Sequence, residues 1–309
     1  MATGTEVVSA AAPKPGGLES PRFAVATFGV LVCLAIAVYY PVLYYMVDQW
    51  SWDDNYSHGF LIVPLAAWFA YERKNKLKKI PIEGSWLGLI PLAIGTLTLG
   101  VGRLGVELMN MRSSFVFTII GLVLLLFGTR VFRVLAFPLL FLFLMVPLPN
   151  SVVNIVAFPL QLLATDAAVN ALHALHIPAL REGNIIHLAS SQLFVAEACS
   201  GLRSLTALLT LGVTFAYFFR KSMLERVILV FSTIPIAIFV NSFRVALTGV
   251  LTHYYGKEVA EGWIHQLEGL FTFGLAFFLL MLLAWVLRLV WPKAKTKATT
   301  PPVTPEVAP

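Results

Sequence analysis

The chain has 309 residues, of which 58% are hydrophobic and only 12% are charged. A soluble domain usually carries about 25% charged residues, so this chain has too few polar side chains to cover a water-soluble surface. The net charge of +6 does not indicate a nucleic-acid binder, because the basic residues lie in short runs between apolar segments. Such runs are typical of topology signals and contacts with lipid headgroups. The composition therefore predicts an integral membrane protein without a nucleic-acid partner.

Apolar runs account for most of the chain. A membrane-spanning helix needs about 20 apolar residues, with a range of roughly 17–25, so the second run is short. The eight runs fall near residues 23–47, 59–71, 85–102, 114–128, 134–149, 202–219, 227–251 and 269–291. They predict an all-α polytopic membrane protein with about eight transmembrane helices. We expect one catalytic domain over residues 22–292, between disordered cytoplasmic tails at 1–21 and 293–309.

The basic residues also predict the topology. With a cytoplasmic N-terminus, the inner segments hold 15 of the 22 lysine and arginine residues, whereas the outer segments hold only Arg103, Arg112, Arg181 and Lys257. Omitting the short second run would place the basic cluster at residues 73–79 outside, against the positive-inside rule. Eight spans with both termini inside is therefore the consistent solution.

Two outer segments carry further structure. Val152–Ile177 mixes apolar residues with scattered polar ones, which predicts an amphipathic helix at the membrane surface. The runs Ile185–Leu188 and Leu193–Val195 predict a small β-hairpin before the sixth span. A separate outer loop contains Trp50, Trp52, Tyr56 and His58, which is typical of an aromatic interfacial belt.

The two cysteines, Cys33 and Cys199, occupy different settings. Cys33 lies within an apolar run, which favours a buried hydrophobic role and makes a disulfide with Cys199 geometrically unfavourable. Cys199 stands where the outer hairpin meets the sixth span, at a helix N-terminus that lowers the pKa of a thiol. Helical spacing places Cys199, Arg203, Thr206 and Thr210 on one face. A polar face within a span is expected to contact other helices or a water-filled cavity.

Two further polar positions map to the outer ends of the last spans. Asn241, Arg244 and Thr248 share a face of the seventh span, where a charged residue costs about 2.5–3.5 kcal/mol and is usually kept for a role. The alternative for Arg244 is that it extends to the outer headgroups. His265 lies at the outer end of the eighth span.

Three polar residues therefore map to the outer ends of the last three spans. Cys199 as a nucleophile, Arg244 as a cation and His265 as a proton shuttle together fit cysteine acyl transfer. We expect no metal or cofactor, because no metal-ligand spacing is present.

At these residues the sequence resembles the exosortase/archaeosortase family of membrane transpeptidases. The matching segments are Tyr56-Ser57-His58-Gly59-Phe60, Glu197-Ala198-Cys199-Ser200-Gly201-Leu202-Arg203, Asn241-Ser242-Phe243-Arg244-Val245 and Gly262-Trp263-Ile264-His265. The resemblance implies Cys199 as the nucleophile, with Arg244 and His265 as the other catalytic residues. Histidine at the third position points to the bacterial branch. We expect substrate contacts at Arg203, His58 and Asn241.

The resemblance also implies partners and a location. The substrates would be exported proteins with a C-terminal tag made of a short PEP-CTERM-like motif, one transmembrane helix and a basic cluster. The enzyme would cleave at the motif and transfer the protein to an unidentified surface acceptor. It would lie in the bacterial inner membrane, with the active site on the periplasmic face.

Three alternatives remain open from the sequence. A plain cysteine endopeptidase would release the same acyl-enzyme to water. A transporter or flippase would use Arg203 and Arg244 to bind an anionic substrate, although the chain shows no repeated halves. A non-catalytic membrane scaffold would leave the polar face around Cys199 without a role.

Overall fold

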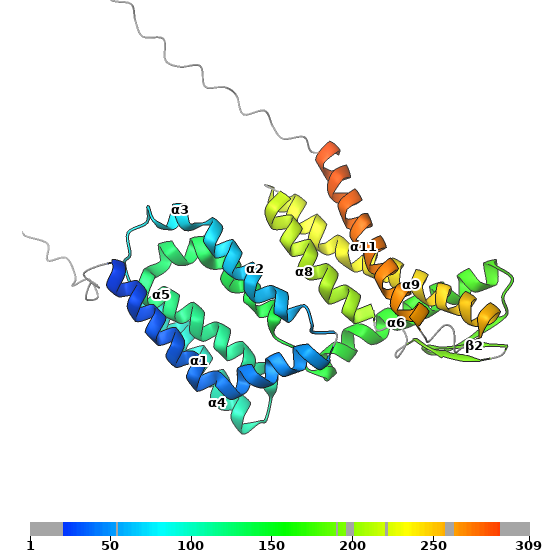
Figure 1. Ribbon diagram of the computed structural model, residues 1–309, viewed down its shortest axis with the longest axis horizontal. Helices are drawn as coiled ribbons and strands as arrows, with labels where there is room; N and C mark the ends of the chain where they lie inside the picture. Colours follow the sequence, from blue (N-terminus) through cyan, green and yellow to red (C-terminus); the bar gives the residue numbers. More distant parts are fainter. Residues whose placement is uncertain are drawn as a thin grey trace, which may run out of the picture. The chain divides into compact units, whose positions relative to one another are not determined.

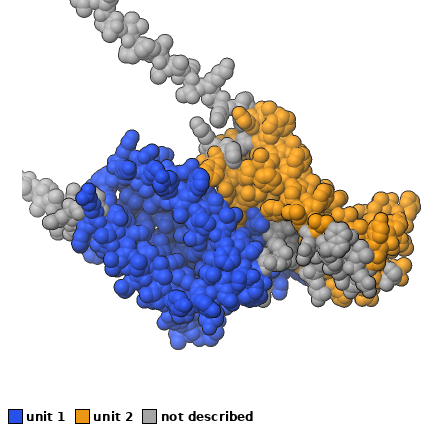
Figure 2. Space-filling model, in the orientation of Figure 1, with its two compact units in different colours: residues 1–160, 202–207 blue, residues 161–201, 208–309 orange. Residues whose placement is uncertain are grey.

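The computed structural model describes residues 21–53, 55–189, 191–195, 201–219, 222–256 and 263–290. It is almost entirely helical (Figure 1). The chain divides into two compact units (Figure 2). Unit 1 comprises residues 1–160 and 202–207, and unit 2 comprises residues 161–201 and 208–309. The expected single catalytic domain over residues 22–292 stays a prediction.

Within the described residues, six helices are long and apolar enough to cross a membrane. This confirms an all-α polytopic membrane fold with a small sheet. Two shorter apolar helices, Gly59–Glu72 and Leu205–Phe218, correspond to the predicted second and sixth spans. The six candidates are Arg22–Trp52, Trp86–Leu104, Leu108–Met145, Ser151–Ala174, Met223–Tyr255 and Leu267–Val290.

Unit 1 contains the N-terminal helices. They are α1 (Pro21–Trp52), α2 (Gly59–Glu72), α3 (Lys74–Leu77), the short 3₁₀ helix η1 (Trp86–Gly88), α4 (Leu89–Leu104), α5 (Leu108–Phe141) and the 3₁₀ helix η2 (Leu142–Met145). Apolar side chains such as Leu34 and Leu97 are exposed on their outer surfaces. In a membrane these surfaces face the lipid tails.

Helix α5 folds back on itself at Gly128. This residue has φ 84° and ψ 179°, a conformation essentially restricted to glycine. The space where its Cβ would lie is occupied by the carbonyl oxygen of Glu83. The rings of Phe117 and Phe143 lie 5.1 Å apart, although 26 positions separate them. The predicted runs 114–128 and 134–149 are therefore the two antiparallel legs of a helical hairpin.

Contacts between helix ends in unit 1 agree with the grouping of segments that the basic residues predict. At one end, Arg112 Nη1 donates to Gln49 Oε1 at 2.7 Å, which joins α5 to α1. At the other end, Glu83 and Arg130 form an exposed ion pair at 3.8 Å. The first contact joins two segments that are both expected outside. The ion pair joins two segments that are both expected inside. Which end faces the cytoplasm stays a prediction.

Unit 2 combines a sheet with the C-terminal helices. The second half of α6 (Asn150–Ala174) precedes strands β1 (Ala179–Glu182), β2 (Ile185–Leu188) and β3 (Gln192–Phe194), which form an antiparallel sheet in that order. The helices are α8 (Gly201–Phe219, of which 202–207 belong to unit 1), α9 (Met223–Tyr255) and α11 (Trp263–Val290). The predicted hairpin is confirmed as β2 and β3, and β1 is an additional strand.

The sheet packs on the end of α6 and on α9. Leu172, Ile186, Leu193 and Val245 are all buried in one apolar cluster. The predicted helix over 152–177 is present as α6, but it is long and apolar enough to cross a membrane. Its expected position at the membrane surface therefore stays a prediction.

Candidate active site

The predicted catalytic residues differ in how far the structure describes them. Cys199 lies outside the described residues, and α8 begins two positions later at Gly201. The backbones of Arg203 and His265 lie in the first turns of α8 and α11, while their side chains are outside the description. Arg244 is described in full. The catalytic roles of Cys199 and His265 stay predictions.

The polar face predicted on α9 is turned into the protein. Asn241 is 8% exposed, Thr248 is 2% exposed and Arg244 is half-buried. The spacing of 3 and 7 positions had placed these three residues together on a helix. The contact of Arg244 with α11 favours an interior position over the alternative in which it extends to the outer headgroups. Burial leaves little of Asn241 accessible to a substrate.

The Arg244 side chain lies against the first part of α11. Its Nη2 is 3.8 Å from the point where a Cβ on Gly269 would lie. The guanidinium also interacts electrostatically with the Glu268 carboxylate. Position 265 is one helical turn before positions 268 and 269, so all three lie on the same side of α11. The backbone therefore places His265 on the side of α11 that Arg244 contacts.

Glu268 lies close to Arg244, a neighbourhood that the sequence pattern does not predict. It is 4% exposed, and its Oε2 accepts a hydrogen bond of 2.9 Å from Thr248 Oγ1 on α9. The signal available in the sequence was an acidic residue three positions after His265 at the start of an apolar span. Helix spacing alone does not identify contacts between helices, so this signal does not pair Glu268 with Arg244.

The loop that carries His58 contacts α8 within unit 1. His58 precedes α2, is half-buried, and makes hydrogen bonds with the backbone of Asn55 and Leu144. Burial lowers the pKa of His58, and the two backbone hydrogen bonds oppose this shift. The Asn55 carbonyl accepts a hydrogen bond of 3.3 Å from Thr206 Oγ1 on α8. The His58 loop therefore contacts α8 one turn after Arg203.

Two predictions about individual residues are wrong. Trp50 and Tyr56 are each 5% exposed, and Tyr56 donates to the Leu148 carbonyl oxygen at 3.0 Å. They pack the interior of unit 1 instead of forming an interfacial belt, while Trp52 is exposed. Cys33, expected to be buried, is exposed on α1.

The polar face of α8 is confirmed where it is described, since Thr206 is half-buried and Thr210 is buried.

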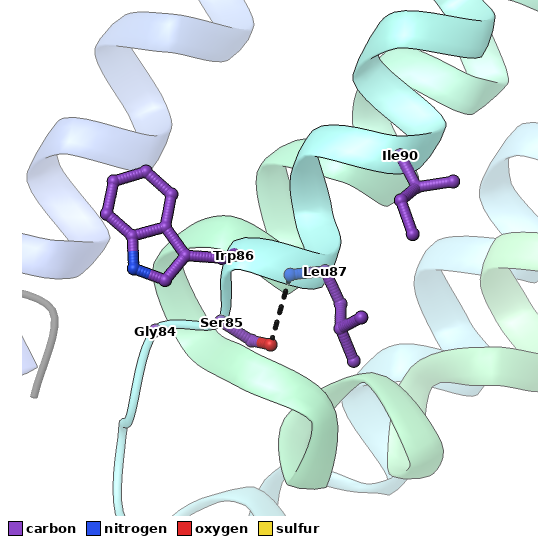
Figure 3. Close-up of a pocket in the computed structure, with 5 residues that line it drawn as sticks. All are labelled: Gly84, Ser85, Trp86, Leu87 and Ile90. Carbon is purple, nitrogen blue, oxygen red and sulfur yellow. Dashed lines mark hydrogen bonds between the residues drawn. The ribbon is translucent and has the colours of Figure 1, made fainter. Parts of the chain in front are cut away.

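An open pocket lies elsewhere in unit 1. It is lined by Gly84, Ser85, Trp86, Leu87 and Ile90, and Ser85 Oγ accepts from the Leu87 amide (Figure 3). None of the predicted site residues lines it, and it lies beside Glu83, at the helix ends expected inside.

Among the described residues, no group of three or more histidine, cysteine, aspartate or glutamate side chains is placed to hold a metal ion.

The fold defines a multi-pass membrane protein, with buried polar residues on α9 and α11 such as Asn241, Thr248 and Glu268. Residues 50–282 match the family described as transmembrane exosortase, so the chain belongs to that family. The matched range contains every predicted site residue and covers most of the chain. Searches of curated proteins and of solved structures each found no match.

Proposed function

We propose that this chain is a cysteine transpeptidase that cleaves C-terminal sorting signals of exported proteins. The exosortase family implies a membrane transpeptidase that acts on sorting signals. The proposal adds the nucleophile Cys199, the oxyanion-stabilising Arg244 and the proton-transferring His265. The observation that carries it is the placement of the Arg244 guanidinium beside Glu268 and Gly269, one turn after His265 on α11.

The proposed reaction has two halves. The Cys199 thiolate attacks the scissile carbonyl carbon, and Arg244 stabilises the negative charge that develops on the carbonyl oxygen. His265 protonates the leaving amine as the C–N bond breaks, which leaves the substrate as a thioester on Cys199. An acceptor nucleophile then gives a proton to His265 and attacks the thioester. The C–S bond breaks, and the thiolate is regenerated.

The substrate binds in this proposal along α8 and the loop before α2. The hydrogen bond between Thr206 and Asn55 joins that loop to α8, which supports shared substrate contacts for His58 and Arg203. A substrate contact from Asn241 on α9 stays a prediction of the sequence, because only 8% of this residue is exposed. The substrates are exported proteins with a short motif, one transmembrane helix and a basic cluster. A surface acceptor receives them on the periplasmic side of the bacterial inner membrane.

The direct test is processing of a co-expressed tagged substrate. Cys199→Ala should abolish cleavage while leaving the abundance of the membrane protein near normal. Cys33→Ala is the matched control, because Cys33 lies on the exposed surface of α1, and it should cleave normally. Normal processing by Cys199→Ala would refute the proposed enzyme.

The proposed location is tested by thiol labelling. A membrane-impermeant reagent should label Cys199 in spheroplasts of a Cys33→Ala strain. Single cysteines introduced at Lys76 or Lys295 into a chain without native cysteines should stay unlabelled until the membrane is permeabilised. The reverse pattern would place the site on the cytoplasmic side.

A further inference from the structure

Glu268 is a buried carboxylate with no part in the reaction described above. It is 4% exposed and lies near the start of α11, at the beginning of a candidate span. A buried carboxylate is unfavourable unless it is paired and hydrogen-bonded. Here the pairing comes from α9, through the electrostatic interaction with Arg244 and the hydrogen bond from Thr248. Glu268 therefore links the two helices at the level of the proposed catalytic arginine.

The contacts around Glu268 fix its orientation. Thr248 Oγ1 lies 2.9 Å from Glu268 Oε2 and 3.0 Å from the carbonyl oxygen of Arg244, one turn earlier on α9. The carboxylate is thus held by the same helix that carries Arg244. The guanidinium lies beside Gly269 on α11, with Nη2 at ordinary van der Waals distance from a Cβ at that position.

We propose that Glu268 is a positioning residue, which together with Thr248 holds the Arg244 guanidinium in the orientation needed to stabilise the oxyanion. This inference rests on the proposed function. An oxyanion donor is effective when it is fixed before the charge develops. An arginine side chain otherwise has many rotamers, and the Glu268 carboxylate restricts them by attracting the guanidinium toward α11.

The test is a double-mutant cycle on the rate of Cys199 acylation by a tagged substrate. Glu268→Gln keeps the shape and can still accept a hydrogen bond from Thr248, but removes the charge. It should slow acylation about 10- to 100-fold, as expected for a misplaced catalytic group. In an Arg244→Ala background the same substitution should change the rate less than about twofold, because Glu268 acts through Arg244. Equal losses in both backgrounds would overturn the inference.

A second variant covers the case in which Glu268→Gln fails to fold. Thr248→Val removes the hydroxyl that orients the carboxylate and should slow acylation in the same direction. Thr272→Val is the matched control, because the Thr272 hydroxyl bonds only to carbonyl oxygens of its own helix in the described contacts. It should acylate at the wild-type rate. Wild-type acylation by Thr248→Val would contradict the inference, whereas absence of acylation in the unmodified protein would refute the proposed function itself.

Discussion

The guanidinium of Arg244 on α9 and the backbone of Gly269 on α11 are in direct proximity, with Nη2 3.8 Å from the position of a Cβ at residue 269. A Cβ added at Gly269 would meet the arginine at ordinary van der Waals distance. The helices α9 and α11 thereby bring a cation to the turn after His265. The acyl-transfer account depends on this contact.

Substitutions at Gly269 should show whether Arg244 acts from its position beside this residue. Gly269→Ala adds a methyl group at van der Waals distance, so we expect cleavage of tagged substrate near the wild-type rate. Gly269→Leu should push the guanidinium away and reduce cleavage by about 10²–10³, the loss typical of a missing oxyanion donor. Both rates are measured by immunoblot at matched expression. Full activity of the leucine variant would mean that Arg244 does not act from this position.

The two arginines near the site should respond differently to lysine. Arg244→Lys should fail nearly as badly as Arg244→Ala, because the forked donors of a guanidinium cannot be reproduced by a point charge. The expected loss is on the order of 10²–10³. Arg203→Lys should retain much of the activity if its role is general electrostatics. A dead Arg203→Lys beside an active Arg244→Lys would reverse the two roles.

The hairpin in α5 should depend on Gly128. Gly128→Ala places a β-carbon against the Glu83 carbonyl in a conformation that glycine alone adopts readily, at a cost of at least about 1–3 kcal/mol. Gly100→Ala is the control, because no atom lies within 4 Å of its added Cβ. Thermal unfolding in detergent should show a lower Tm for the first variant only. An unchanged Tm for Gly128→Ala would contradict the hairpin geometry.

The His58 loop should lose stability in acid. Burial lowers the pKa of His58 below its ordinary value of 6.5, so the unfolded chain binds a proton more readily than the folded one. The stabilisation is fully present above pH 6.5 and declines as the pH falls through the lower, folded-state pKa. His58→Gln does not titrate. Between about pH 7.5 and pH 5.5, Tm should fall more for the wild type than for this variant.

Local periodicity predicts the elements of this protein better than the contacts between them. The spacing of Asn241, Arg244 and Thr248 suffices to predict a buried face, because helical geometry alone brings them together. The partner of that face, Glu268, depends on packing between α9 and α11, which no local pattern encodes. The short strand Ala179–Glu182 was missed for a similar reason, since exposed residues without alternation give no strand signal.

The reversal at Gly128 shows the same limit in unit 1. Two apolar runs were predicted correctly from hydropathy, but the backbone break between them depends on the approach of Glu83, 45 positions earlier. Trp50 and Tyr56 were expected in an interfacial belt because composition alone favours it. Their hydrogen bonds to the carbonyl oxygens of Met145 and Leu148 are long-range contacts that explain their burial.

Trapping the acyl-enzyme tests the central claim most directly. Purified protein mixed with tagged substrate and quenched in acid should carry the substrate fragment on Cys199, detected by mass spectrometry and released by hydroxylamine as expected for a thioester. Cys199→Ala should form no adduct and Cys33→Ala should form it normally. Cleavage of the substrate without any adduct on Cys199, or an equal adduct in the Cys199→Ala variant, would contradict the mechanism.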